Sequence, residues 1–115
     1  TSTSLVDLTG ASITITTGAN PINFSGCHSV RNNTVGGDII FNFTIDDVLQ
    51  FGTGGLVEDQ NGSDSRWSMA SPQGQSAALS AGSHTIKQQW KVASGTGFLL
   101  ANTGEANMFF VNEIK

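Results

Sequence analysis

Hydrophobic and polar residues alternate along several stretches of this chain. Residues 12–16 alternate Ser or Thr with Ile. Residues 38–48 place four large apolar side chains on one face: Ile39, Phe41, Phe43 and Ile45. A third stretch alternates in the same way and places His84, Ile86, Gln88, Trp90 and Val92 on one face. A period of two residues is typical of β-strands, so these stretches are predicted as strands.

The rest of the chain fits the same interpretation. Five further strands are predicted at residues 22–24, 50–57, 66–70, 97–101 and 107–114. Turn-forming residues separate the strands at 17–21, 35–37, 60–63, 81–83 and 102–104. The best helix candidate, residues 75–81, is short and has no apolar stripe. We therefore expect an all-β, antiparallel β-sandwich or jelly roll, as one domain over residues 1–115.

The last predicted strand is apolar on both faces. Met108, Phe110 and Ile114 share one face, and Phe109 and Val111 share the other. A sandwich strand normally has one face in water. This pattern predicts a subunit interface or a strand covered on both sides, and we assign the interface to Met108, Phe109, Phe110 and Val111.

Composition excludes several classes of protein. Only 12% of the 115 residues are charged, with five Lys and Arg against nine Asp and Glu, for a net charge of -4. This balance disfavours nucleic-acid binding, and no apolar run is long enough for a membrane-spanning helix. Cys27 is the single cysteine, so no internal disulfide forms. Because the chain begins at Thr1 and not Met, it was either processed or, as we favour, is a domain of a longer protein.

Residues 79–92, Leu-Ser-Ala-Gly-Ser-His-Thr-Ile-Lys-Gln-Gln-Trp-Lys-Val, resemble a stretch found in the C1q/TNF-like jelly-roll domains of bacteriophage structural proteins. Residues 93–97 look like the hairpin turn that follows it. Residues 111–114, Val-Asn-Glu-Ile, are similar to the closing strand of that family. The resemblance covers residues 79–115, and before that only the strand at 39–45 agrees in pattern.

This resemblance implies a fold and a setting. Such domains assemble as homotrimers at tail-fibre tips or on capsid surfaces, so the implied location is the virion surface. The implied partners are further copies of the chain, other virion proteins and a host glycan or receptor. The resemblance implies neither a cofactor nor catalytic residues.

Cysteine and histidine are the natural candidates for catalysis or metal binding. Cys27 and His28 are neighbours in sequence, so in a strand they point to opposite faces and cannot pair. We interpret Cys27 as a buried small hydrophobic residue, and His28 and His84 as strand-end or interface residues. Three copies of one histidine on a trimer axis could bind a metal, but no second ligand has a suitable spacing. We therefore expect no metal site.

Several shorter patterns also invite a functional interpretation. An EF-hand beginning at Asp59 would need Gly and Glu where Asp64 and Ala70 stand, which leaves only a looser Ca²⁺ site from Asp59, Asn61 and Asp64. Asp46-Asp47 is interpreted as a solvated turn and not a glycosidase pair, and residues 52–55 as a bend. The sequons at 32–34, 42–44 and 61–63 are attributed to chance.

Carbohydrate recognition would need an exposed aromatic side chain beside polar groups. Trp67 and Arg66 follow the acidic loop, so Arg66, Trp67 and Asp64 are the candidate ligand-binding residues. The competing interpretation, which we favour, places Trp67 in the core or in a subunit interface. Trp90 is assigned to the core because Ile86 and Val92 share its face.

The sequence thus favours a non-enzymatic, trimeric virion domain: a tail-fibre or tail-tip module for attachment to the host surface. The alternatives are a trimeric capsid decoration protein and a monomeric carbohydrate-binding module. A hydrolase would require a histidine beside a carboxylate in a cleft.

Overall fold

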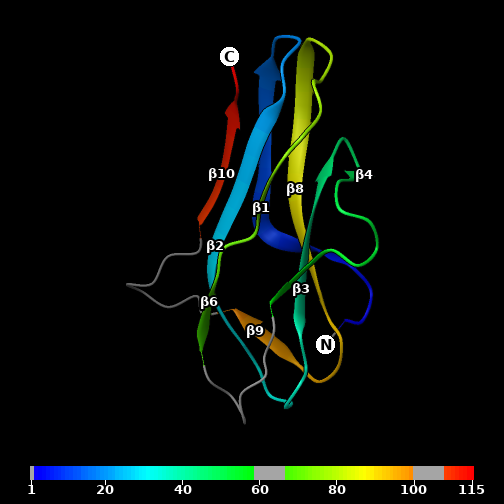
Figure 1. Cartoon of the computed structure of the whole chain (residues 1–115), viewed down its shortest axis with the longest axis vertical. Coiled ribbons are helices and arrows are strands. Elements are labelled where there is room, and N and C mark those ends of the chain that lie inside the picture. Colours follow the sequence, from blue (N-terminus) through cyan, green and yellow to red (C-terminus); the bar gives the residue numbers. More distant parts are fainter. Residues whose placement is uncertain (1, 59–66, 100–107) are drawn as a thin grey trace.

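The structure is a computed structural model, and it describes residues 2–58, 67–99 and 108–115. The described residues are all-β, with antiparallel strands in two sheets packed as a compact sandwich (Figure 1). The fold class predicted from the alternating pattern is thereby confirmed at the level of an antiparallel β-sandwich.

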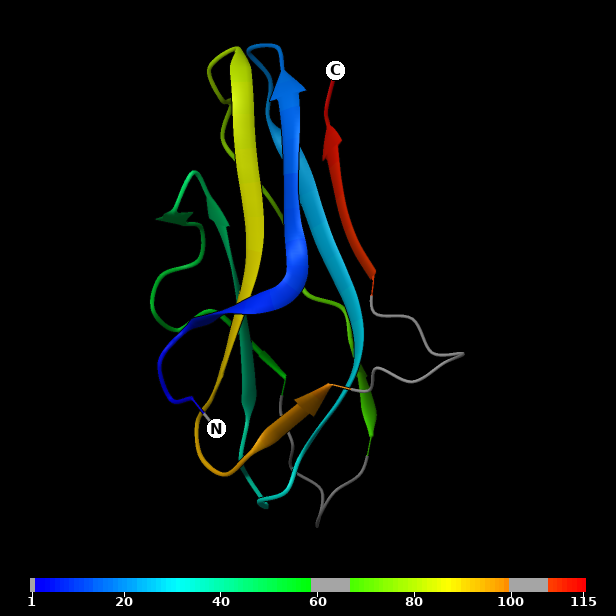
Figure 2. The ribbon, with the colours of Figure 1, turned by 180° about the vertical axis from the view of Figure 1, so that it is seen from behind.

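The first sheet is built around a long strand, β8 (Gly82–Val92), which we use to name it the β8 sheet. β8 pairs with β1 (Val6–Thr17) on one edge and with β3 (Ile39–Ile45) on the other. The far edge of β3 is covered by β4 (Val48–Leu49) and β5 (Leu56–Glu58). Figure 2 shows β8 and β1 side by side in the upper half of the view, below which β1 bends across β8.

The second sheet has one long strand, β2 (Ile22–Asn32), and is called the β2 sheet. Four short strands flank it: β6 (Ser68–Ala70), β7 (Gln73–Gln75), β9 (Gly97–Leu99) and β10 (Met108–Glu113). Because β10 and β7 both pair with Asn23, they lie on opposite edges of β2. β9 and β6 likewise both pair with Val30.

The core lies between the two sheets in two clusters. In the first, Ile22 and Phe24 of the β2 sheet meet Phe43, Ile45 and Ile86 of the β8 sheet. In the second, Val30 and Ala70 meet Ile39, Phe41 and Val92. The rings of Phe24 and Phe43 lie 4.6 Å apart across the sandwich. Burying each such side chain stabilises the fold by about 1.5–3 kcal/mol.

Several predicted segments differ in the structure: β1 and β2 are longer than predicted, a turn separates β3 from β4, and two further segments differ in kind. Residues 50–55 form a turn-rich loop and only β5 is a strand, because the Asn42 side chain bonds the backbone of Phe51 and Gly52 and holds the loop against β3. Residues 93–97 connect the two sheets and do not close a hairpin, since β9 pairs with β2. The Asn33 backbone N–H donates to the Thr96 carbonyl, and the Thr96 backbone N–H donates to Oδ1 of the Asn33 side chain, which holds that connection in place.

Candidate functional site

The outer faces of the two sheets differ in chemistry. On the β8 sheet, the hydroxyls of Thr14 and Thr85 lie 2.9 Å apart, and Lys87 forms ion pairs with Asp7 and Asp47. The part of this face around Thr85 and Lys87 is therefore polar and internally paired, while Val57 is exposed on the same face beside Ile40. The character of this polar part matches the Ser, Thr and charged residues that alternate with the apolar core positions.

The outer face of the β2 sheet is apolar in part, because Asn23, Ser25 and Gln75 also point outward from it. In β2, even-numbered residues point into the core and odd-numbered residues point outward. Residues that pair directly across antiparallel strands share a face. The outward set includes Cys27, Arg31, Trp67, Met69, Phe98, Met108 and Phe110, and we call this surface the apolar face.

The apolar face holds much of the exposed apolar surface of the chain. Of the eight large hydrophobic residues exposed in the described ranges, four lie here: Trp67 at 43%, Met69 at 60%, Met108 at 42% and Phe110 at 49%. Met108 lies opposite Cys27, and the Cys27 sulfur is 3.4 Å from that of Met69. An exposed apolar patch of this kind marks an interaction surface.

One end of the apolar face carries a row of three stacked side chains. The guanidinium of Arg31 lies 4.3 Å from the ring centroid of Phe98 and 5.2 Å from that of Trp67. The row crosses three strands, because Phe98 pairs with Arg31 in the sheet and Trp67 immediately precedes β6. We call it the Trp67–Arg31–Phe98 ladder.

The structure divides the four residues predicted as an interface. Phe109 and Val111 pack against the first core cluster, and the ring of Phe109 stacks on Phe43 at 6.0 Å. Met108 and Phe110 point outward and stay exposed. Only these two of the four therefore remain for contact with another subunit.

The residues predicted to bind a ligand are only partly described. Arg66 and Asp64 lie outside the described residues, as do Asp59 and Asn61 of the predicted calcium loop. Trp67 is described, and its exposure corrects the interpretation that it is a core residue of this chain. Sequence reasoning missed Arg31 and Phe98, which come from β2 and β9 and join Trp67 only through strand pairing.

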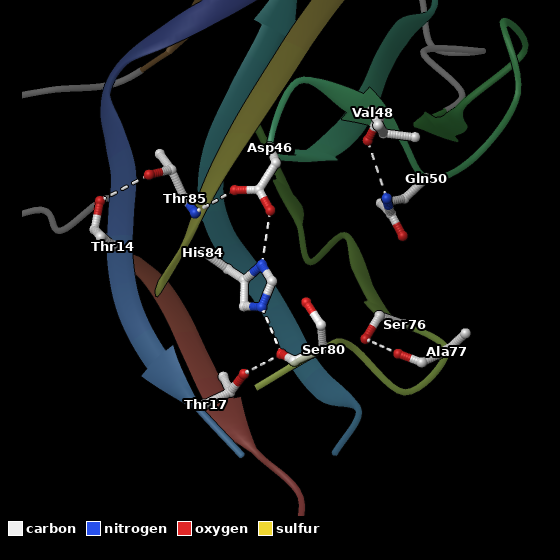
Figure 3. A network of polar contacts seen from close by, with 10 residues as sticks. All are labelled: Thr14, Thr17, Asp46, Val48, Gln50, Ser76, Ala77, Ser80, His84 and Thr85. Carbon is white, nitrogen blue, oxygen red and sulfur yellow. Dashed lines mark hydrogen bonds and ion pairs between the residues drawn. The ribbon is translucent and has the colours of Figure 1, made fainter. Parts of the chain in front are cut away.

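The most developed polar network surrounds His84 (Figure 3). Its Nδ1 lies 2.7 Å from Oδ2 of Asp46, and its Nε2 lies 2.8 Å from the backbone carbonyl of Ser80. The other Asp46 oxygen accepts the Thr85 backbone N–H at 2.9 Å. A carboxylate and a carbonyl only accept hydrogen bonds, so this geometry favours the form of the imidazole in which both ring nitrogens are protonated, which is the cation.

The same contacts shift the pKa values of His84 and Asp46 in opposite directions. The hydrogen bond to Asp46, followed by that to the Ser80 carbonyl, raises the pKa of His84. The Thr85 N–H, followed by His84, lowers the pKa of Asp46. Asp46 and Asp47 both have positive φ and form the two-residue turn between β3 and β4. The predicted turn at Asp46-Asp47 is thus present, and the contact of Asp46 with His84, which the sequence did not predict, fastens that turn to β8.

His84, Asp46 and Ser80 do not form a nucleophilic triad. Ser80 contacts the imidazole through its backbone carbonyl and not through its hydroxyl. A general base needs one ring nitrogen free to accept the proton of a nucleophile. Because both nitrogens of His84 face acceptors, the arrangement holds the structure together and offers no base for catalysis.

His28 lies in the middle of β2, which corrects the expectation of a strand-end or interface residue. It is 2% exposed, and its Nε2 is 2.9 Å from Oε1 of the fully buried Gln88. This bond joins the two sheets through the core. Cys27 points to the opposite face, as expected, but is half-buried on the apolar face and not within the core.

No metal-binding cluster of three or more His, Cys, Asp or Glu side chains exists within the described ranges. Among these same residues, no helix is long and apolar enough to cross a membrane. Asn42 of the second sequon is fully buried, so it is closed to glycosylation in the folded chain. The surface with the clearest potential for interaction is thus the apolar face.

Comparison of this chain with known protein families, with characterised proteins and with solved structures finds no match.

Proposed function

We propose that this chain is a non-enzymatic structural domain that assembles as a homotrimer through the end of its apolar face that holds Met108 and Phe110. The observation that carries the proposal is the exposure of two large apolar side chains, Met108 and Phe110, on one face of the edge strand β10, whereas Lys87 on the other sheet is paired with Asp7 and Asp47. Burying large apolar side chains of this kind is the main favourable contribution to stable subunit association.

The proposed setting is the surface of a bacteriophage particle, where the domain is a tail-fibre or tail-tip module for host attachment. Support for this setting, for the trimeric state and for a C1q/TNF-like jelly roll comes from the sequence resemblance at residues 79–92 and 111–114. A trimer repeats any weak binding site three times, which can raise avidity about 10²- to 10⁴-fold.

Self-association is tested by sedimentation equilibrium of the purified chain. We expect a mass three times that of the 12.0 kDa chain at micromolar concentration. Phe110→Ser should weaken association about tenfold or more, as loss of a buried aromatic contact does. Val48→Ser is the matched control, since Val48 is 64% exposed in the hairpin of the other sheet. A monomeric wild type, or equal effects of the two variants, contradicts the proposal.

Two alternatives have their own discriminating observations. A trimeric capsid decoration protein would give the same mass, and electron microscopy of the labelled domain on the particle separates it from a tail tip. A monomeric carbohydrate-binding module is favoured by one observation, the exposure of Trp67. It would bind a glycan while sedimenting as a single chain.

A further inference from the structure

We propose that the Trp67–Arg31–Phe98 ladder binds the carboxylate of an acidic sugar, such as a uronic or sialic acid. This names the ligand class for the surface-attachment role and in that respect rests on the proposed function.

The first argument is the state of the Arg31 cation. The ion pairs of the described residues involve His84 and Lys87, and Arg31 has none among them. Its Nε is buried without a hydrogen-bond partner. A planar guanidinium carries five donors that suit the two oxygens of a carboxylate. Arg31 is therefore a cation with unused hydrogen-bonding capacity.

The second argument is preorganisation. The rings of Trp67 and Phe98 contact the guanidinium from neighbouring strands and restrict its position. A side chain fixed before binding loses less conformational entropy when a ligand arrives. Across three strands spaced about 4.8 Å apart, the row is about 10 Å wide. This geometry suits a ligand whose charged group binds Arg31 while the adjacent part of the ligand stacks on the ring of Trp67.

The third argument selects a sugar with one carboxylate over a polyanion. Among the outward-facing strand residues of the β2 sheet that the structure describes, Arg31 is the single charged side chain. Lys87 and Lys91 belong to the opposite sheet, and the chain has a net charge of -4. A polyanion such as nucleic acid needs several cations along its path. A carboxylated sugar needs one, and its C–H face can stack on the exposed Trp67.

The ladder is separate from the centre of the proposed subunit interface. Arg31 follows Cys27 by four residues, which is about 13 Å along β2. Ser29, opposite Met69, adds a hydroxyl on the same face between them. Sugar binding and self-association can therefore be measured independently.

The experiment is isothermal titration calorimetry with three probes that each carry one carboxylate: the methyl glycosides of glucuronic acid, of galacturonic acid and of N-acetylneuraminic acid. Each is compared with its methyl ester, which keeps the ring and removes the charge. We expect wild type to bind at least one acid about tenfold or more tightly than its ester, as a charged hydrogen bond warrants. Equal binding of acid and ester, or no binding of any probe, overturns the inference.

Variants assign the effect to the ladder. Arg31→Gln should abolish the difference in affinity between the acid and its ester. Trp67→Ala should weaken the binding of the acid and of the ester by the same factor. Lys91→Gln, which removes one charge from the opposite sheet, should change neither. If Arg31→Gln lowers the fraction of trimer in sedimentation equilibrium but leaves saccharide binding intact, Arg31 pairs with a carboxylate of a second copy of the chain. The inference is then wrong. Because the ester comparison uses wild type, the test does not depend on the variants folding.

Discussion

One carboxylate oxygen of Glu113 lies 2.8 Å from the side-chain amide nitrogen of Asn20 and accepts the backbone N–H of Gly18 at 2.7 Å. Glu113 ends β10, and the other two residues form the connection between β1 and β2. The contact therefore ties the edge strand of the β2 sheet to the connection between the two sheets.

This tie should be sensitive to acid. The Asn20 bond, followed by the Gly18 bond, lowers the pKa of Glu113. A lowered pKa in the folded state contributes stability above the ordinary glutamate pKa of about 4.5, and this is lost as the pH falls through the lowered value. Glu113→Gln should lose less stability than wild type between pH 5 and pH 3, measured by urea denaturation. An identical acid dependence would contradict the tie.

The ion pair of His84 with Asp46 should make the stability of the fold sensitive to rising pH. Because its pKa is raised, the contribution of His84 to stability is complete below the ordinary histidine pKa of about 6.5 and is lost as the pH rises through the raised value. We expect the free energy of unfolding of wild type to fall as the pH rises above about 6.5, and that of His84→Gln to change less. An NMR titration of the His84 ring checks the direction of the shift directly.

The Gln88 and His28 side chains leave no room at Gly26. A Cβ on Gly26 would lie 2.7 Å from Gln88 Oε1 and 2.7 Å from His28 Nε2. Gly26→Ala should therefore push this buried pair apart and cost about 1–3 kcal/mol of stability. Gly52→Ala is the control, because a Cβ on Gly52 would meet nothing within 4 Å among the described residues beyond its own chain neighbours. Chemical denaturation that finds the two variants equal would contradict the close packing.

The Asn42 side chain should be essential for the 50–55 loop. Its Oδ1 accepts the backbone N–H groups of Phe43 and Phe51, and its Nδ2 donates to the carbonyls of Phe51 and Gly52. Asn42→Ala leaves these groups unpaired, so we expect a loss of about 2–4 kcal/mol. Gln50→Ala, which removes one exposed bond to Val48, should stay within about 0.5 kcal/mol. Equal thermal unfolding of both variants would argue against the role of Asn42.

The strands that can be predicted from sequence are those whose core positions are large and apolar. The pattern at 38–48 and 84–92 is clear because Phe41, Phe43, Ile86 and Val92 occupy the inward positions. In β2, however, three inward positions hold Gly26, His28 and Asn32. These residues obscure the alternation, so the sequence predicts only residues 22–24 of an eleven-residue strand.

The candidate site is harder to predict from the sequence than the strands are, for a related reason. Alternation tells which residues share a face within one strand, but not which strands are neighbours. The apolar pattern of β10 points to Met108 and Phe110 directly. Arg31, Trp67 and Phe98 lie far apart in the chain, and no local pattern connects them. Their meeting depends on β6 and β9 both pairing with the end of β2.

The pairing of β2 has a consequence for the order of folding. β6, β7, β9 and β10 each pair with β2. β2 precedes all four in the chain, and β10 follows it by about eighty residues. Loop-closure entropy makes such distant pairings slow to form. While the chain emerges from the ribosome, the edges of β2 await their partners, and such unpaired edges favour aggregation. The buried polar residues that obscure β2 in the sequence also make it less hydrophobic during that interval.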